Sequence, residues 1–418
     1  ISACEKGGHW QQALSTLREM QQWHVAPNVI SYSTTVSACA KGKCWQLALA
    51  MLTEMRTRRP APDVFTYSAA ITACERGGRW HDALGLIYEM LLLRLEPHVI
   101  SYSAAISACE KGGQWQLALG MLHEMRDQQL EPNVISYSAA ISACEKGKRW
   151  QGAVDMLREM RQRHLAPNEI SYNAAISACE KGEQWQEALG ILCEMQQWQV
   201  PPDVISYSGA ISACEKSGKW QEALAMLCEM RQRQLAPNVI SYSAAISACE
   251  KRERWEDALG LLRDMHQRQL APNVISFSAA ISACEKGERW PEALDMLREM
   301  SHRQLAPDVI TYSAAISACG KGERWQEALD IMSDMQQRQL APDVVSYDSA
   351  LDACDTGGRW HEALGILGQM RQRQVVADAI AYSSAIRACG KGERLHEIVD
   401  LLCDMGQSLE QRGLNHVA

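Results

Sequence analysis

Lysine occurs at one regular spacing in this sequence, and a row of cations at a regular spacing could bind a polyanion. The chain has 13 lysines, and ten of them share a register of 35 residues that also contains Arg76 and is broken only by Thr356. The register runs from Lys6 to Lys391 and includes Lys41, Arg76, Lys111, Lys146, Lys181, Lys216, Lys251, Lys286 and Lys321. Lysine near a helix end also complements the helix dipole, by about 0.3 to 1 kcal/mol. Because arginine would do so equally well and is plentiful elsewhere, we interpret this cationic ladder as an anion-binding surface.

The chain as a whole is acidic, with a formal net charge of -8 and a pI near 5.8. Taken alone, this acidity argues against a nucleic-acid partner. A basic stripe on one face of an acidic protein nevertheless creates a local field that attracts a polyanion. The composition is therefore compatible with nucleic-acid binding at the cationic ladder.

Cysteine and histidine are the other residues whose chemistry has to be considered. Twelve of the 16 cysteines share one register from Cys4 to Cys389, and no CxxC pair occurs. Equivalent positions of successive parallel units seldom satisfy disulfide geometry, so we expect small buried thiols in a reducing compartment. The histidines are scattered, and the sequence has no nucleophile–base group or metal-ligand cluster. We expect no catalysis, no metal and no cofactor, and no apolar run approaches the roughly 18 residues of a membrane span.

The cationic ladder belongs to an internal repeat of 35 residues. The stretch SYSAAISACEKG occupies residues 101–112 and again 136–147, and close variants follow at the same interval. We expect eleven full repeats over residues 29–413, a repeat lacking its front at 1–28 and a short tail at 414–418. Because the sequence opens inside a repeat, we expect it to be a fragment or an imperfectly predicted gene product. The full repeats begin at Val29, Val64, Val99, Val134, Glu169, Val204, Val239, Val274, Val309, Val344 and Ala379.

Each repeat has the pattern of two amphipathic helices. In the repeat at Val99, Tyr102, Ile106 and Cys109 have helical spacing, which predicts a helix over residues 99–111. Two glycines then predict a turn, and a second apolar pattern starting at Trp115 predicts a helix that ends near residue 129. Two short helices cannot bury their apolar faces alone, so repeats must stack. We predict an all-α fold, a right-handed superhelical α-solenoid, in which the recurring tryptophan packs between repeats.

The first helix carries a second face that packing does not require. On a helical wheel the second, fifth, ninth and thirteenth residues of a repeat lie together, away from the apolar stripe. The thirteenth residue is the cationic ladder. The second residue forms an apolar ladder of Ile30, Phe65, Ile100, Ile135, Ile170, Ile205, Ile240, Ile275 and Ile310, continued by Val345 and Ile380.

The unit resembles the pentatricopeptide repeat family in its uniform 35-residue length, its tyrosine near the start, its glycine at the turn and its proline before the next copy. The resemblance covers residues 1 to 413 and is closest to the P-type subclass. It implies an organellar protein, in chloroplast or mitochondrion, that binds single-stranded RNA with one nucleotide per repeat. No targeting peptide is visible in the chain. No deaminase signature follows the last repeat, so RNA editing chemistry has no support.

The resemblance also implies roles for individual residues. The fifth and thirty-fifth residues of a repeat together select the base, the apolar second residue wedges between bases, and the lysine or arginine of the cationic ladder contacts phosphate. The nine base-reading pairs are Ser33 with Asp63, Ser68 with His98, Ser103 with Asn133, Ser138 with Asn168, Asn173 with Asp203, Ser208 with Asn238, Ser243 with Asn273, Ser278 with Asp308 and Ser313 with Asp343.

Ser with Asn resembles an adenine reader, Ser with Asp a guanine reader and Asn with Asp a uracil reader, so the predicted target is 5′-GNAAUAAGG-3′. Ser68 with His98 fits no reader. The repeats at Val344 and Ala379 depart from the code and are expected only to cap the stack. An Asn or Asp before a helix is also a good N-cap, worth about 1 kcal/mol. Capping alone does not explain why Asn173 replaces the usual serine.

These observations predict sequence-specific binding of single-stranded RNA by a monomer that acts by occupancy in RNA processing, stabilisation or translation. The alternative is a protein-binding scaffold of the tetratricopeptide kind, which would use the same surface for peptides. A steep loss of affinity with salt would favour RNA. A third reading is that the near-identical repeats reflect recent duplication with little selection on the code.

Overall fold

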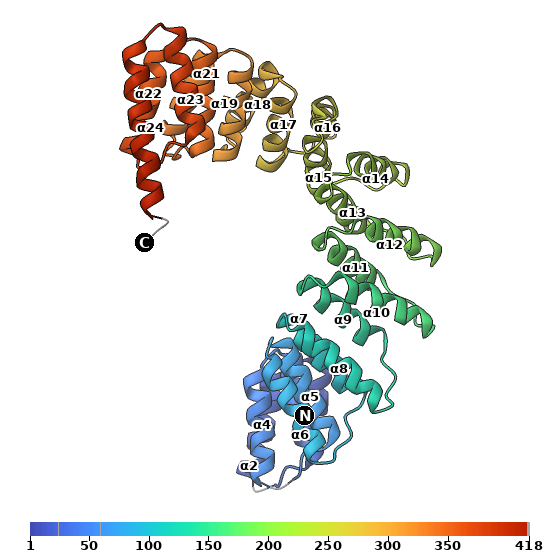
Figure 1. The fold of residues 1–418 in the computed structure, drawn as a ribbon. Helices are drawn as coiled ribbons and strands as arrows, with labels where there is room; N and C mark the ends of the chain where they lie inside the picture. The colour runs from blue at the N-terminus through green and yellow to red at the C-terminus, as the bar shows by residue number, and fades with distance from the viewer. Residues whose placement is uncertain (24, 59, 416–418) are drawn as a thin grey trace. The chain divides into compact units, whose positions relative to one another are not determined.

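The computed structural model describes residues 1–23, 25–58 and 60–415, and the secondary structure of these residues is helical (Figure 1). The first helices of the repeats are α1 (Ser2–Gly7), α3 (Val29–Lys41), α5 (Val64–Arg76), α7 (Val99–Lys111), α9 (Val134–Lys146), α11 (Glu169–Lys181), α13 (Val204–Lys216), α15 (Val239–Glu250), α17 (Val274–Lys286), α19 (Val309–Lys321), α21 (Val344–Thr356) and α23 (Ala379–Lys391). The second helices are α2 (Trp10–Gln22), α4 (Trp45–Arg58), α6 (Trp80–Leu92), α8 (Trp115–Asp127), α10 (Trp150–Gln162), α12 (Trp185–Gln197), α14 (Trp220–Gln232), α16 (Trp255–Gln267), α18 (Trp290–His302), α20 (Trp325–Gln337), α22 (Trp360–Gln372) and α24 (Leu395–Asn415). Of the predicted tail, residues 416–418 lie outside the described residues.

The helix bounds follow the sequence pattern closely. Helix α7 spans the predicted residues, whereas α8 ends at Asp127, two residues before the predicted end. The early end arises because Gln129 adopts a left-handed backbone with φ 56°. In that conformation the Leu130 N–H donates to the carbonyl of Met125 at 3.0 Å, which closes the helix end.

The chain divides into two compact units, Ile1–Ala213 and Cys214–Ala418. Within the first, neighbouring first helices pack in the order α3, α5, α7, α9, α11, and within the second in the order α15, α17, α19, α21, α23. Each of these first helices also packs on the second helix of its own repeat, as α7 does on α8 and α19 on α20. The all-α helical-repeat fold is therefore confirmed.

Small and aromatic residues of the first helices form the core between repeats. Tyr102, Ile106 and Cys109 are fully buried, and equivalent residues are buried in each repeat from Val29 to Val344. All 16 cysteines are free, and 11 of the 12 in the shared register are buried. Burial raises the pKa of Cys109 to about 11, so this residue remains a neutral thiol at physiological pH. The prediction of small buried thiols is confirmed.

The recurring tryptophan packs between repeats, as predicted. Trp115 lies against the turn of the following repeat, so close to Gly147 that a Cβ atom there would overlap the indole ring. Arg149, which follows this turn, stacks over the same indole, with its guanidinium carbon 4.9 Å from the Trp115 ring centre. At the equivalent turn position Arg252 replaces glycine, and α15 ends at Glu250, earlier in its repeat than the neighbouring first helices.

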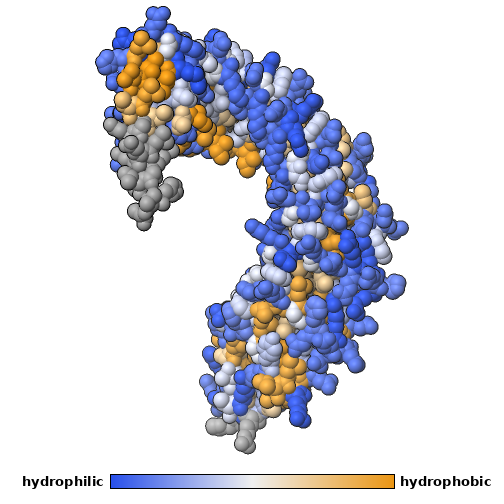
Figure 2. All heavy atoms as spheres, viewed as in Figure 1, coloured by the Kyte–Doolittle hydropathy of each residue, from blue (hydrophilic) through white to orange (hydrophobic). Residues whose placement is uncertain are grey.

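Helix α24, the second helix of the last repeat, keeps an apolar face in contact with solvent. Leu395, Val399 and Leu402 of α24 are exposed, by 47 to 77%. Figure 2 shows a hydrophobic patch over the part of the chain that holds α22 and α24. Of the helices in the described residues, none combines the length and the apolar character required to cross a membrane.

Candidate nucleic-acid interface

The apolar ladder lies on the surface rather than in the core. Its side chains sit in the first turn of each first helix and are 55 to 67% exposed, from Phe65 at the low end to Ile310 at the high end. An exposed isoleucine in one repeat would need no explanation, but the same exposure recurs in nine successive repeats, so the surface carries a regular row of apolar side chains that the core does not use.

Seven of the nine predicted base-reading pairs have their two side chains in contact. The Ser103 hydroxyl is 3.5 Å from Asn133 Oδ1, and equivalent distances of 3.3 to 3.5 Å join Ser138 with Asn168, Ser243 with Asn273, Ser278 with Asp308 and Ser313 with Asp343. Ser68 Oγ is 3.4 Å from His98 Nε2, and Asn173 Nδ2 is 3.3 Å from Asp203 Oδ1. Ser33 donates to the carbonyl of Ile30, and Ser208 to that of Val204. In these seven repeats the two side chains therefore lie next to each other on the same surface.

The thirty-fifth residue is also the N-cap of the next repeat's first helix. Asn133 Oδ1 accepts hydrogen bonds from the backbone N–H of Ser136 at 2.9 Å and from the Ser136 hydroxyl at 3.0 Å. Since the oxygen must face these donors, the amide orientation is fixed and Nδ2 is left to donate. Asp308 caps α19 in the same way through Oδ1, and its second oxygen is left to accept. Capping therefore uses one polar atom of the side chain and leaves the other available to a ligand.

The third residue of the repeat positions both members of the pair, a role that the sequence did not reveal. The Ser136 hydroxyl lies 2.7 Å from Ser103 Oγ and 3.0 Å from Asn133 Oδ1, and Ser136 is fully buried. Ser103 in turn donates to the carbonyl of Val99 at 2.7 Å. The sequence does contain a feature that could have indicated this role, because each repeat from Val29 to Val344 has Ser or Thr at its third position.

The uracil-reader pair has a different network. The Ser206 hydroxyl donates to Asn173 Oδ1 at 2.6 Å, and the Ser206 N–H donates to Asp203 Oδ1 at 2.8 Å. Burial raises the pKa of Asp203, but the hydrogen bonds with Ser206, Glu169 and Asn173 together outweigh it, so the pKa is lowered overall. Asp203 is therefore an ionised hydrogen-bond acceptor at neutral pH.

Hollows lie between consecutive residues of the apolar ladder. One of about 200 Å³ is lined by Phe65 and Ile100, with Ser68 and His98 also lining it and with Lys41 and Arg76 beside them. Another, of about 290 Å³, is lined by Ile310 and Val345 together with Ser313 and Asp343. The three predicted classes of residue thus meet around the first hollow, and two of them around the second.

Lysines of the cationic ladder are paired with carboxylates, a feature that the repeat pattern alone does not predict. Lys146 Nζ lies 2.5 Å from Glu110 Oε1 and donates to the Glu110 carbonyl at 3.2 Å. Arg76 instead donates to the Ala40 carbonyl. The lysines are 34 to 43% exposed and their partner carboxylates 17 to 20%. The pairs are Lys41 with Glu5, Lys111 with Glu75, Lys146 with Glu110, Lys181 with Glu145, Lys251 with Glu215, Lys286 with Glu250 and Lys321 with Glu285.

The pairing changes what the cationic ladder can do. Each lysine brings one positive charge and each partner glutamate one negative charge, so this part of the surface is close to neutral. An exposed ion pair is worth only about 0 to 1 kcal/mol, so a phosphate can compete for the lysine. Contact with phosphate stays a prediction. In the part of the chain that the structure describes, no group of three or more His, Cys, Asp or Glu residues could hold a metal ion.

Comparison with known families agrees with this fold and repeat length. Sequence profiles of the pentatricopeptide repeat domain match residues 50–112, 85–149, 120–181 and 330–392. Profiles of the PPR repeat family match 1–41, 167–216, 210–251, 237–286 and 272–321, and the PPR repeat profile matches 30–59, 310–340 and 380–408. Together the matches run without a gap from residue 1 to residue 408. The chain belongs to the pentatricopeptide repeat family.

Solved structures of the same family resemble the chain. The crystal structure of the pentatricopeptide repeat protein PPR10 from maize has a TM-score of 0.55 and 23% sequence identity over 99% of this chain and 68% of its own. PPR10 in complex with an 18-nt psaJ RNA element has a TM-score of 0.44 and 24% identity over 96% of this chain and 62% of its own. No match was found among curated protein sequences. The likeness to the first structure shows the fold.

Proposed function

We propose that this protein binds single-stranded RNA in a sequence-specific manner, with one nucleotide for each of the nine repeats that begin at Val29 to Val309. The observation that carries the proposal is the recurrence, in each of these repeats, of an exposed apolar second residue. In the repeats at Val64 and Val309 this residue also lines a hollow together with the polar pair at the fifth and thirty-fifth positions. Base stacking on exposed side chains tolerates any base, whereas hydrogen bonds to the base edge discriminate.

The capping geometry supplies a physical basis for the code. With Asn at the thirty-fifth position, the free Nδ2 donates, which suits an acceptor on the base such as adenine N1. With Asp, the free oxygen accepts, which suits the imino N–H of guanine or uracil. The fifth residue, Ser or Asn, then distinguishes the larger from the smaller base. The nine pairs read 5′-GNAAUAAGG-3′, with the N-terminal repeats at the 5′ end as the family implies.

The proposed action is occupancy without a catalytic step. A bound repeat array shields the transcript from nucleases or prevents it from pairing, and this is how we expect it to act in organellar RNA processing, stabilisation or translation. The proposed organisation is eleven repeats over residues 29–413 preceded by a partial repeat at 1–28, working as a monomer. The buried thiols suit a reducing compartment.

Direct binding measurements separate this function from the peptide-binding alternative. We expect the purified protein to bind a fluorescent 5′-GAAAUAAGG-3′ RNA at least tenfold more tightly than the same RNA in a duplex, because duplex bases cannot enter the hollows. Affinity should fall as salt rises from 50 to 200 mM, by an amount that reports the number of phosphates contacted. A chain that binds single and double strands equally, or neither, would not be a reader of single-stranded RNA.

A further inference from the structure

The repeat at Val344 departs from its neighbours on the face that carries the proposed RNA site. Its fifth and ninth residues are Asp348 and Asp352 where the repeat at Val274 has serines. Its twelfth and thirteenth are Asp355 and Thr356, where that repeat has glutamate and lysine. The following repeat has Arg387 at its ninth position, again in place of serine. These changes concern polar residues outside the core pattern.

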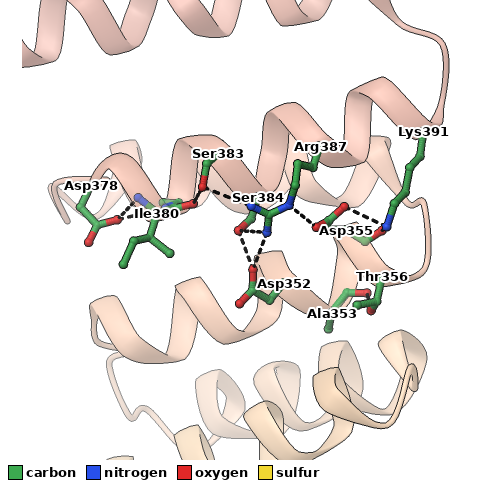
Figure 3. A network of polar contacts seen from close by, with 11 residues as sticks. Asp352, Ala353, Asp355, Thr356, Asp378, Ile380, Ser383, Ser384, Arg387 and Lys391 are labelled. Carbon is green, nitrogen blue, oxygen red and sulfur yellow. Dashed lines mark hydrogen bonds and ion pairs between the residues drawn. The ribbon is translucent and has the colours of Figure 1, made fainter.

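The substituted residues bond to one another (Figure 3). Arg387 Nε donates to Asp355 Oδ2 at 2.6 Å, and Arg387 Nη2 donates to Asp352 Oδ1 at 3.2 Å. The Ser384 hydroxyl donates to the same Asp352 oxygen at 2.5 Å, and Lys391 pairs with Asp355 at 3.1 Å. Arg387 and Lys391 of α23 are therefore held by carboxylates of α21, the first helix of the preceding repeat.

Asp348 adds a carboxylate with one buried oxygen, Oδ1, that has no hydrogen-bond partner among the described residues. Burial, together with the charges of Asp378, Asp352 and Asp343, raises the pKa of Asp348 to about 6. At neutral pH this side chain is mostly ionised, and it lies where the other full repeats have a neutral serine or, in the repeat at Glu169, an asparagine. Asp348 thus adds a negative charge close to those of Asp378, Asp352 and Asp343, while Arg387 and Lys391 are paired with Asp352 and Asp355.

We propose that the repeat at Val344 accepts no nucleotide and so sets the 3′ edge of the RNA footprint at the repeat that begins at Val309. This inference rests on the proposed function. An incoming phosphate would meet a net negative surface, without the lysine that Thr356 replaces, and the Arg387 guanidinium is occupied by Asp352 and Asp355. Repulsion between like charges in this place costs binding energy that stacking on Val345 and Ile380 would have to overcome.

The repeat at Val274 provides the residues that should enable the repeat at Val344 to bind a nucleotide. The repeat at Val274 has Ser278, Ser282, Glu285 and Lys286 at the four altered positions, with Asp308 as its thirty-fifth residue. A converted variant carries Asp348→Ser, Asp352→Ser, Asp355→Glu, Thr356→Lys and Arg387→Ser, together with Ala381→Ser, which supplies the hydroxyl that positions the pair in the other repeats. With Asp378 unchanged as the thirty-fifth residue, the converted repeat has the guanine-reading pair.

The test uses four RNAs that share 5′-GAAAUAAGG-3′ and differ only in a tenth nucleotide at the 3′ end. The wild-type protein should bind all four within twofold of one another. The converted variant should prefer guanine at that position several-fold, since a well-matched base edge gives about 1 to 3 kcal/mol of discrimination. The matched control is Asp295→Asn with Asp330→Asn, which raises the net charge by the same two units but on second helices, away from the proposed RNA site. This control should show no preference for any base at the tenth nucleotide.

The possible failures are distinguishable. Wild-type discrimination at the tenth nucleotide, with the nine-nucleotide core still bound specifically, would overturn the inference and leave the proposed function standing. A converted variant that keeps wild-type helicity and binds the core but gains no guanine preference would also overturn it. Loss of specific binding to the core in the wild-type protein would overturn the proposed function, and this inference with it.

Discussion

Replacing Ser243 by Asn and Asn273 by Asp should move the base preference of one repeat from adenine to uracil. The repeat begins at Val239 and is expected to read the seventh nucleotide of 5′-GNAAUAAGG-3′. A matched base edge is worth about 1 to 3 kcal/mol, so the ratio of affinities for the two RNAs should reverse by at least tenfold. Competition binding with RNAs that differ only at this nucleotide measures the change directly.

The structure explains why the exchange should be tolerated. Asn273 Oδ1 caps α17 by accepting from the Ser276 N–H at 2.9 Å, and an aspartate oxygen can accept the same bond. Asn at the fifth position already occurs as Asn173, where it accepts from the Ser206 hydroxyl, and Ser276 can donate to Asn in the same way. The exposed Ile240 and Ile275 are unchanged, so stacking should hold the total affinity near its starting value.

Single substitutions separate capping from reading. Asn273→Asp alone keeps the cap and should shift preference from adenine toward guanine, because it recreates the pair of Ser278 with Asp308. Asn273→Ala removes the cap and should lower the free energy of unfolding by about 1 kcal/mol. If the double variant keeps its melting temperature and still prefers adenine at the seventh nucleotide, these side chains serve the helix ends and the base-reading hypothesis is wrong.

The second large effect concerns the lysines of the cationic ladder. Replacing Lys111, Lys146 and Lys286 by Gln should weaken binding to every RNA sequence alike. Each lost phosphate contact lowers the slope of log affinity against log salt by about 0.7 for a single strand. Three contacts give a slope change of about 2, equivalent to roughly 20-fold in affinity between 50 and 200 mM salt. Binding isotherms at four salt concentrations provide the slope.

The partner carboxylates make a matched control possible. Lysine removal leaves Glu75, Glu110 and Glu250 unpaired, and their charges would repel RNA even if the lysines never contacted phosphate. A variant in which these glutamates are also changed to Gln restores neutrality. If the lysines contact phosphate, this variant with six substitutions should regain part of its affinity but keep the reduced salt slope. A slope equal to that of the wild type would assign the lysines to inter-repeat ion pairs alone.

Most of the fold could be predicted from the sequence because one pattern is repeated eleven times. The helix of residues 99–111 and the buried places of Tyr102, Ile106 and Cys109 follow from helical spacing, which every copy repeats with little variation. The exposure of Ile100 could be predicted as well, since it lies outside the apolar stripe on the same helix. What remained open was the contact between repeats, which depends on how far one helix is displaced along the next.

The ion pairs illustrate that limit. Lys146 pairs with Glu110, which is 36 residues earlier, rather than with its sequence neighbour Glu145. The glutamate before each lysine is plain in the sequence, but its partner follows only from the stacking geometry. The same holds for the Ser136 hydroxyl, which joins Ser103 of one repeat to Asn133 at its end. Both contacts lie between repeats. The 35-residue period predicts that neighbouring repeats touch, but it does not predict which side chains meet.

The central claim is that this protein reads single-stranded RNA one base per repeat, and an unbiased selection tests it most directly. A random RNA library would be enriched on the purified chain at physiological salt and the bound sequences determined. We predict a single-stranded consensus of 5′-GNAAUAAGG-3′, with the lone uracil at the fifth position where Asn173 and Asp203 form the pair. Recovery of duplex RNA, or of sequences without a purine-rich consensus, would contradict the claim.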